Sequence, residues 1–304
     1  MSNLIFSRLV QGIIVIIGIT FIVFMAMFLT GDPAALMLGE GASQAQIAEF
    51  RHRMGFDRPL LVQYGSFLAR AAVGDFGMSL HFNQPNLQLV LERLPATIQL
   101  ASISLLIGTT LAIPLGVMAA VHRNSWLDTL LMGVALVGQA TPGFWLGIML
   151  ILVFAVNLGW FPASGRGTIA HLVLPALTLA VFPLASNVRL MRSSTLEVLH
   201  QDFVKTARAK GLKENIVLFK HVLRNALSPV LTMVGIQIGS FMGGAVITET
   251  IYSWPGVGRL VVQAIMTKDF PLVQTVVAFL ALVFVAVNLL IDIAYTLVDP
   301  RVRY

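Results

Sequence analysis

The sequence predicts an all-α polytopic membrane protein with six transmembrane helices. Three observations predict this class: 57% of the residues are hydrophobic, only 11% are charged, and the apolar residues gather in long stretches. A soluble domain averages about 25% charged residues. A helix needs roughly 20 apolar residues to cross a bilayer core of about 30 Å. The absence of cysteine excludes disulfides and thiolate metal sites.

Six stretches have this length and composition. They are Leu9–Leu29, Thr97–Val121, Leu127–Val156, His171–Leu190, Pro229–Ile251 and Leu272–Val298. The first follows Arg8 and has the general look of a signal peptide. Its apolar run is longer than a typical signal sequence, and no small-residue cleavage site follows it. We therefore expect it to remain as a membrane anchor.

Lys and Arg residues predict the orientation, because short cytoplasmic loops retain positive charge. With the N-terminus inside, the inner segments carry Arg8, Arg123, eight basic residues from Arg189 to Arg224, and the basic C-terminal tail. The short outer loops then carry only Arg166, Arg259 and Lys268. We expect both termini in the cytoplasm. The same asymmetry accounts for the net charge of +6 without nucleic-acid binding.

The segment between the first two spans, about Thr30–Pro95, is too long for a plain linker. Ser43 with Gln46 resembles a capping box that starts a helix, and Gly55 suits the end of that helix. Pro59 predicts the start of a second helix, with Gly74 near its end. We expect a small helical cap outside the membrane, which serves either loop packing or partner docking.

Nothing in the sequence indicates an enzyme. No Asp, Glu, Lys or Arg lies near the middle of a predicted span, where ionisable groups usually mark ion relays. This weighs against a proton-coupled carrier. Ion coordination by side-chain amides stays an alternative, and the candidate residues are Gln99, Gln139, Gln237 and Asn288. The patterns G-x-x-x-x-G-K-[ST], H-E-x-x-H and G-x-S-x-G are absent. We expect no catalytic residue, no metal and no cofactor, so uphill transport would need a partner's energy.

A basic segment before the fifth span carries the strongest functional signal. Between Lys205 and Val230, six Lys or Arg residues stand against one Glu. Apolar residues recur at helical spacing and predict one apolar stripe: Leu196, Leu199, Phe203 and Ala207. Gly211 suits the left-handed position that ends a helix. The pattern predicts a helix, a glycine turn and a second helix.

The second amphipathic run leads into the fifth span. Its apolar side is predicted to hold Ile216, Phe219, Leu223 and Leu227. Ser228 can cap the next helix, and Pro229 suits the first position of that helix. Two interpretations are open from the residues alone. The segment either lies on anionic lipid or is presented to a cytoplasmic partner.

The stretch from Lys205 to Gly211 resembles the EAA loop of ABC-importer permeases, whose pattern is E-A-A-x-x-x-G with an aliphatic-x-Leu-Pro element further on. Leu227-Ser228-Pro229 stands near the later element. Lys205 and Thr206 depart from the pattern, but T-A-R-A-K-G is usual in the peptide and nickel branch. In this family the loop is the coupling helix that seats in an ATPase cleft. The resemblance implies that role for Leu199, Phe203, Lys205, Thr206, Ala207, Arg208 and Gly211.

Other motifs extend the resemblance over nearly the whole chain. They are "GDPA" at Gly31–Ala34, "GDFGMSL" at Gly74–Leu80, "RLPAT" at Arg93–Thr97, "ETIYSWPGVGRL" at Glu249–Leu260 and the terminal "DPRVRY". Together they are similar to the dipeptide/oligopeptide permease subunit with the long first periplasmic loop. The resemblance implies a type I ABC importer fold in a bacterial inner membrane. It also implies a homologous second permease subunit, two cytoplasmic ATPase subunits, and a periplasmic or lipid-anchored substrate-binding protein.

The resemblance also implies a division of the chain. Residues 1–29 form the cytoplasmic tip and first span, and residues 30–95 form the periplasmic helical loop. Residues 96–298 form the permease domain, with the coupling loop at 193–228, and residues 299–304 form a cytoplasmic tail. The expected solute is a dipeptide or oligopeptide. Nickel, glutathione or another small solute is the alternative within the family, and a stand-alone secondary carrier is the alternative outside it.

The fifth span has two faces of different character. Gly235, Gly239 and Gly243 form a row that lets another helix approach closely. The roughly opposite side carries Met233, Gln237, Ser240, Gly244 and Thr248. That side is neither purely apolar nor charged, so it suits either a peptide pathway or ordinary interior packing. Gly108, Ala112 and Gly116 form a second small-residue row in the second span.

Overall fold

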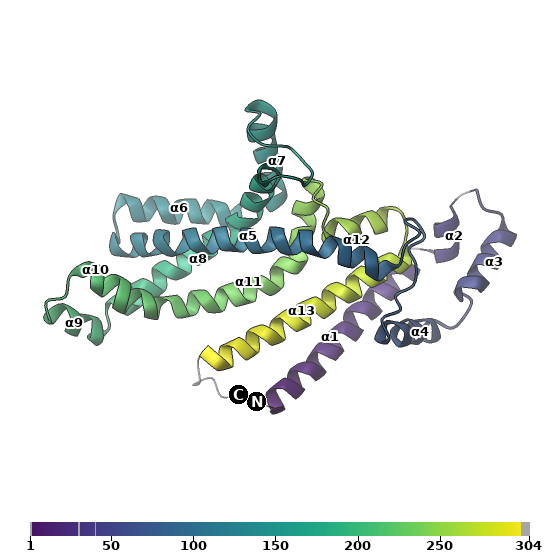
Figure 1. The fold of residues 1–304 in the computed structure, drawn as a ribbon, viewed down its shortest axis with the longest axis horizontal. Helices are drawn as coiled ribbons and strands as arrows, with labels where there is room; N and C mark the ends of the chain where they lie inside the picture. Colours follow the sequence, from purple (N-terminus) through teal and green to yellow (C-terminus); the bar gives the residue numbers. More distant parts are fainter. Residues whose placement is uncertain (1, 30, 40, 299–304) are drawn as a thin grey trace. The chain divides into compact units, whose positions relative to one another are not determined.

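The computed structural model describes residues 2–29, 31–39 and 41–298, and this part of the chain is mostly helical (Figure 1). Side chains of residues 2–5, 242–244 and 294–298 are not described. The expected tail at 299–304 lies outside the described residues. Within these limits the only β-type pairing is an isolated bridge between Met78 and Pro85.

The helices follow one another in a simple order. They are α1 (Ser2–Leu29), α2 (Pro33–Leu38), α3 (Gln44–Met54), α4 (Leu60–Ala72), α5 (Asn86–Val121), α6 (Trp126–Ala140), α7 (Gly143–Leu150), the π-helix η1 (Ile151–Asn157), α8 (Ile169–Leu199), α9 (Asp202–Ala209), α10 (Glu214–Ile216), the π-helix η2 (Val217–Val222), α11 (Leu223–Ile251), α12 (Val257–Met266) and α13 (Phe270–Val298). The described residues separate into two compact units, 2–97 with 255–292 and 98–254 with 293–298.

Four helices are long and apolar enough to span a membrane, namely α1, α5, α8 and α13. The number rises to six when each of two bent helix pairs counts as one span. The third predicted span, Leu127–Val156, is therefore not one straight helix: α6 and the following helix meet at 103°. Pro142 explains the break, because a residue before proline avoids helical dihedrals. Thr141 has φ −74° and ψ 123°, which is extended backbone.

In the first unit, α1 and α13 pack closely. A Cβ atom at Gly12 would collide with Val285, so glycine is what permits this approach. Arg8 Nε and Asp292 Oδ2 form an ion pair at 2.9 Å. The first helix is also tied to α4, because the hydroxyl of Tyr64 donates to Ile17 O at 2.7 Å.

The predicted starts and ends of the cap helices are confirmed. Ser43 N donates to Gln46 Oε1 at 2.8 Å and Gln46 N to Ser43 Oγ at 3.3 Å, which completes the capping box of α3. Gly55 ends the helix with φ +73°. The second helix, α4, begins after Pro59.

The loop between α4 and α5 is fixed to the start of α13. The buried carboxylate of Asp269 accepts hydrogen bonds from Ser79 Oγ and, at 3.2 Å, from the backbone N–H of His81. Its second oxygen accepts from Leu272 N at 3.3 Å, so the same side chain caps α13. The "GDFGMSL" segment therefore has a structural role within the first unit.

The helix α12 was not predicted from the sequence, and it completes the core of this unit. Val257, Leu260 and Ala264 are fully buried. They belong to one hydrophobic cluster with residues of α5 and α13, such as Val90 and Leu272. The backbone N–H of Val257 donates to Thr97 Oγ1 at 2.8 Å.

In the second unit α8 is central and packs against α6, α7 and α11. Added Cβ atoms at Gly108 and Gly116 of α5 would meet α8: Pro183 Cγ at 2.9 Å and the carbonyl oxygen of Val188 at 2.8 Å. Together with the fully buried Ala112, they show that this small-residue row serves packing within the chain.

Candidate functional site

The predicted apolar stripe from Leu196 to Ala207 does not lie on one helix. The helix α8 ends at Leu199, and α9 begins at Asp202 after a turn at His200 and Gln201. Asp202 lies in the first turn of α9, where a negative charge is favoured. Hydrogen bonding and attraction by Lys205 hold the pKa of the Asp202 carboxyl below its usual value. The prediction of one continuous helix here is wrong.

The turn rotates α9, so a different set of residues faces the interior. Val204 is 0% exposed, whereas its neighbour Phe203 is 39% exposed. Val204 and Ala207 pack in one cluster with Val198 of α8 and Val222 of η2. The structure thus leaves the ring of Phe203 on the surface of a charged segment, where an apolar partner residue could cover it.

The glycine turn after α9 has the predicted geometry. Gly211 has φ +74°, a conformation that side chains with a Cβ atom rarely adopt. No atom lies within 4 Å of a Cβ built on Gly211, so the constraint comes from the backbone alone. Arg208 Nη2 donates to Glu214 Oε1 at 2.6 Å, which joins the two sides of the turn.

The second predicted stripe is also displaced. The residues Val217, Val222 and Ala226 are buried, whereas Phe219 is 69% exposed. The π-helix η2 explains the shift, because an i→i+5 turn inserts an extra residue and rotates the following face. The helix α11 continues through Pro229, so the prediction of a helix start at Ser228 and Pro229 is wrong.

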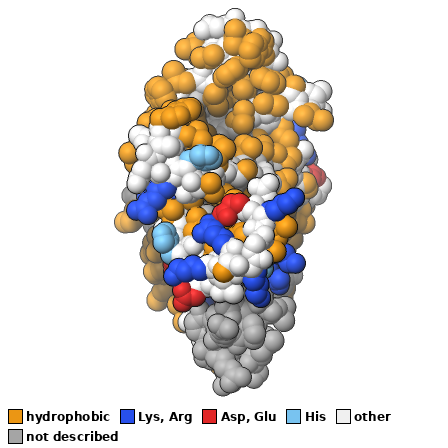
Figure 2. Space-filling model, turned by 90° about the vertical axis from the view of Figure 1, so that its left-hand side faces the viewer, with side chains coloured by type: hydrophobic (Ala, Val, Ile, Leu, Met, Phe, Trp, Pro, Cys, Tyr) orange, Lys and Arg blue, Asp and Glu red, His pale blue; other side chains and the backbone are white. Residues whose placement is uncertain are grey.

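Positive charge gathers around α9 and the turn that follows it. Figure 2 shows Lys and Arg side chains with few carboxylates between them on the face that bears α9 and α10. The exposed basic residues of the segment are Lys205, Arg208, Lys210, Lys213, Lys220 and Arg224. The exposed carboxylates of the same segment, Asp202 and Glu214, are paired with Lys205 and Arg208.

The residues predicted to line a pathway do not share one environment. Gln237 and Thr248 are buried, Met233 is half-buried and Ser240 is exposed. The side chain of Gln237 pairs with Asn187 of α8 through hydrogen bonds of 3.1 and 3.2 Å. Gly244 lies among the residues whose side-chain surroundings are not described.

The glycines predicted to pack α11 lie on another side of the helix. Gly235 and Gly239 are buried. Gly243 lies among the residues whose side-chain surroundings are not described. The burial of the two described glycines agrees with a packing role, but the helix that they admit stays a prediction.

A polar pocket that the sequence did not indicate forms around Arg166. Its guanidinium donates twice to Gln99 Oε1, at 3.1 and 2.7 Å, and lies 5.5 Å from the ring centroid of the buried Trp254. The pocket has a volume of about 470 Å³ and is also lined by Thr168. Gln99 and Arg166 are 67 positions apart, so no local pattern could have connected them.

Among the described residues, no group of three His, Cys, Asp or Glu could hold a metal ion. The strongest chemical features are therefore the basic segment with Phe203, the Asn187–Gln237 pair and the Arg166 pocket. The first is suited to docking, and the other two are polar groups inside or beside a helix bundle.

Comparisons with known proteins agree with a transport role. Residues 112–304 match the family described as binding-protein-dependent transport system inner membrane component, and residues 1–101 match its N-terminal counterpart. The chain is 44% identical to a putative peptide transport system permease protein of Brucella abortus, over 100% of both chains. It is 40% identical to the dipeptide transport system permease protein DppB of Alkalihalophilus pseudofirmus, over 98% of both chains.

A solved structure shows the same fold. The MetNI methionine ABC transporter in inward-facing conformations matches with a TM-score of 0.61 and 18% identity, over 70% of this chain and 97% of that one. The fold is thus that of ABC transporter permeases, and the chain is a multi-pass membrane protein. With both parts of its length matched, the chain belongs to the family of inner membrane components of binding-protein-dependent transport systems.

Proposed function

We propose that the chain is a permease subunit of an ATP-driven importer of dipeptides or oligopeptides in a bacterial inner membrane. The observation that carries the proposal is full-length similarity, at 40 to 44% identity, to permeases named for peptide or dipeptide transport. The chain itself then contributes the membrane pathway and no chemistry. A partner subunit hydrolyses ATP, and a separate binding protein delivers the solute.

The basic segment is proposed as the contact with the ATPase. Lys205, Thr206, Arg208 and Lys210 are exposed, and Phe203 adds an apolar ring among them. The buried side of α9 packs in one cluster with α8, η2 and α11. A force applied at Phe203 therefore reaches two long helices through packed side chains, which is the mechanical contact that a coupled importer requires. Leu199 and Ala207 would support this contact from the buried cluster, and Gly211 would support it through the turn that ends α9.

The topology proposal follows from the same segment. Eight basic residues between Arg189 and Arg224 favour the cytoplasmic side. Both termini then also lie in the cytoplasm, and α2 to α4 lie outside it. We propose a homologous second permease, two ATPase subunits and an external binding protein as partners.

The Arg166 pocket supports a solute that carries a carboxylate. Gln99 and Trp254 hold the guanidinium in place, and an arginine fork suits a carboxylate. We propose that the C-terminal carboxylate of a peptide meets Arg166 as the peptide passes. Met233, Gln237, Ser240, Gly244 and Thr248 stay proposed as pathway residues, although the burial of Gln237 and Thr248 favours an interior role for those two.

Glutathione is the second candidate solute, because the chain is 38% identical over its full length to a glutathione transport system permease protein of Escherichia coli. Uptake into vesicles that contain the whole complex should distinguish the two when dipeptide and glutathione are compared. A labelled dipeptide and its C-terminal amide should then be compared in the wild type and in Arg166→Gln. We expect the wild type to prefer the free carboxylate and Arg166→Gln to lose that preference. An unchanged ratio in the variant would exclude a role for Arg166, whereas faster glutathione uptake would overturn the peptide assignment.

A further inference from the structure

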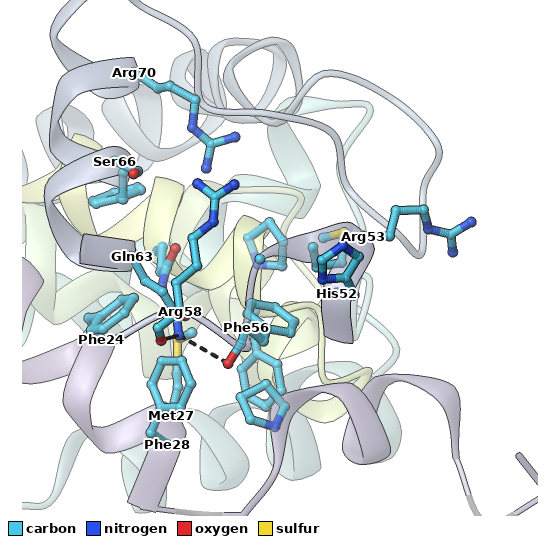
Figure 3. Close-up of a pocket in the computed structure, with 17 residues that line it drawn as sticks. Phe24, Met27, Phe28, His52, Arg53, Phe56, Arg58, Gln63, Ser66 and Arg70 are labelled. Atoms are coloured by element: carbon cyan, nitrogen blue, oxygen red, sulfur yellow. Dashed lines mark hydrogen bonds between the residues drawn. The ribbon is translucent and has the colours of Figure 1, made fainter. Parts of the chain in front are cut away.

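A second polar pocket, of about 360 Å³, lies in the first unit beside the ends of two predicted spans. Its floor is apolar and comes from three helices, as Figure 3 shows for the residues of α1. These floor residues are Phe24, Met27 and Phe28 of α1, Phe67 of α4, and Phe270 of α13. The rim is basic and comes from α4 and from the segment after α3.

Two arginines face one another across this rim. In Figure 3 the guanidinium groups of Arg58 and Arg70 point toward each other, with Ser66 beside them. No carboxylate lines the pocket within the described part of the chain. Among the described residues neither guanidinium makes a hydrogen bond or an ion pair, and Asp57 attracts Arg58 only at longer range. Two like charges that point toward each other repel, and an anion placed between them would attract both.

The positions of Arg58, Ser66 and Arg70 follow from the helical repeat of α4 and from the hydrogen bonds of Gln63. Gln63, Ser66 and Arg70 follow one another at i, i+3 and i+7, so they share one face of α4. The amide of Gln63 donates to Arg58 O at 2.7 Å and to Phe56 O at 3.2 Å. These bonds bring the loop that carries Arg58 onto the face that carries Arg70.

The other charged side chains near the pocket each have a partner of their own. Asp57 Oδ2 bonds His52 Nδ1 at 2.7 Å, and this hydrogen bond is the main cause that lowers the pKa of the Asp57 carboxyl. Arg51 is paired with Asp32. The guanidinium of Arg53 lies 5.4 Å from the Phe50 ring centroid, and in Figure 3 it points away from Arg58 and Arg70.

The position of the pocket indicates what kind of anion reaches it. The apolar span of α1 ends at Leu29, and that of α13 begins at Phe270. A pocket built from the last turns of one span and the first turn of the other lies where the hydrocarbon core meets the headgroups. Ile22 is 67% exposed and Leu29 is 87% exposed, so α1 also offers an apolar surface for an acyl chain.

We propose that this pocket binds the phosphate of an anionic membrane phospholipid, between Arg58 and Arg70 and beside the hydroxyl of Ser66. Guanidinium groups suit a phosphate because their N–H donors match its oxygens in paired hydrogen bonds. The aromatic floor accommodates the glycerol and the first methylene groups. The bound lipid fixes α4 to the ends of α1 and α13, independently of the solute and of ATP hydrolysis.

The test is a titration of the purified full-length protein in neutral detergent with phosphatidylglycerol, followed by native mass spectrometry. Arg58→Gln and Arg70→Gln should each weaken binding about fivefold, the effect of one basic residue near an anionic membrane surface. Arg53→Gln is the matched control, since it removes the same charge from the same pocket but from a guanidinium that points elsewhere. It should leave binding within twofold of the wild type, because its guanidinium lies by the Phe50 ring and points away from Arg58 and Arg70.

A variant that adds an ion pair to Arg70 tests the proposal even if the arginine variants fold poorly. Ser66→Glu places a carboxylate four residues before Arg70, where the two side chains can pair on the helix. It should raise the melting temperature slightly and reduce lipid binding.

Three outcomes overturn the proposal. The first is equal binding in Arg58→Gln, Arg70→Gln and the wild type. The second is equal affinity for phosphatidylethanolamine, because the pocket would then not discriminate lipids by the net charge of the headgroup. The third is displacement of the lipid by inorganic phosphate or acetate at matched concentration, which would make the pocket a site for small free anions.

Discussion

The side-chain amides of Asn187 and Gln237 exchange two hydrogen bonds, 3.1 and 3.2 Å long, between α8 and α11. Asn187 is fully buried, and Gln237 is nearly so. Gln237 Nε2 also donates to Ser186 Oγ at 3.0 Å. In an apolar helix bundle, a buried amide that loses its hydrogen-bond partner destabilises the fold. The pair therefore fixes one register between the two helices.

Gln237→Leu should therefore destabilise the protein. The change leaves the amide of Asn187 buried without its partner, at a cost of about 1–3 kcal/mol. The double variant Asn187→Leu with Gln237→Leu should recover part of the loss, because neither side then carries an unpaired polar group. Thermal unfolding of the purified protein in detergent measures both effects. Ser240→Ala, on an exposed position of α11, is the control, and equal melting temperatures for all variants would contradict the role of the pair.

Gly211→Val should permit membrane insertion but uncouple ATP hydrolysis from uptake. At φ +74° a β-branched side chain is strained, even though no neighbouring atom blocks it. The altered turn would then change the orientation of α9. Gly211→Asn is the matched control, because Asn tolerates the left-handed region. Substrate-stimulated ATPase activity and uptake in reconstituted vesicles would be measured together. Normal values of both for Gly211→Val would remove Gly211 from the coupling mechanism.

Substitutions at two adjacent residues distinguish a loss of docking from a loss of stability. Phe203 is exposed and Val204 is fully buried. Phe203→Asp should release the ATPase subunits during detergent purification, because it puts an unpaired charge in an apolar contact at a cost of a few kcal/mol. The permease itself should keep its melting temperature. Val204→Asp should instead lower that temperature, since it buries the charge in the core of the segment. Retention of the ATPases in Phe203→Asp would contradict the docking role.

The proposed topology can be tested with single cysteines, since the chain has none of its own. Ala45 and Ala209 are both exposed, the first in α3 and the second at the end of α9. A membrane-impermeant thiol reagent should label Ala45→Cys in intact cells. It should label Ala209→Cys only after the membrane is opened. Labelling of both from the same side would overturn the orientation derived from the basic residues.

Features set by a few neighbouring residues were predicted correctly. The capping box of Ser43 and Gln46 and the left-handed turn at Gly211 follow from local hydrogen bonds and backbone freedom. The family assignment was also predictable, because several short motifs recur in order along the chain.

Features decided by packing between distant segments were not predicted. The turn at His200 and the π-helix Val217–Val222 change which residues face inward, so the assumption of an uninterrupted helical period failed at Phe203 and Phe219. Pro229 lies inside α11, although proline favours a helix start. The hydrogen bonds from Arg166 to Gln99 join residues 67 positions apart, which no local pattern reveals.

The most direct test of the central claim is uptake of a labelled dipeptide by vesicles that contain the complete complex, supplied with the binding protein and with ATP on the ATPase side. We expect uptake that requires ATP, persists when the proton gradient is abolished, and is lost when the permease carries Phe203→Asp. Uptake driven by the proton gradient alone, or uptake that continues without the ATPase subunits, would contradict this claim.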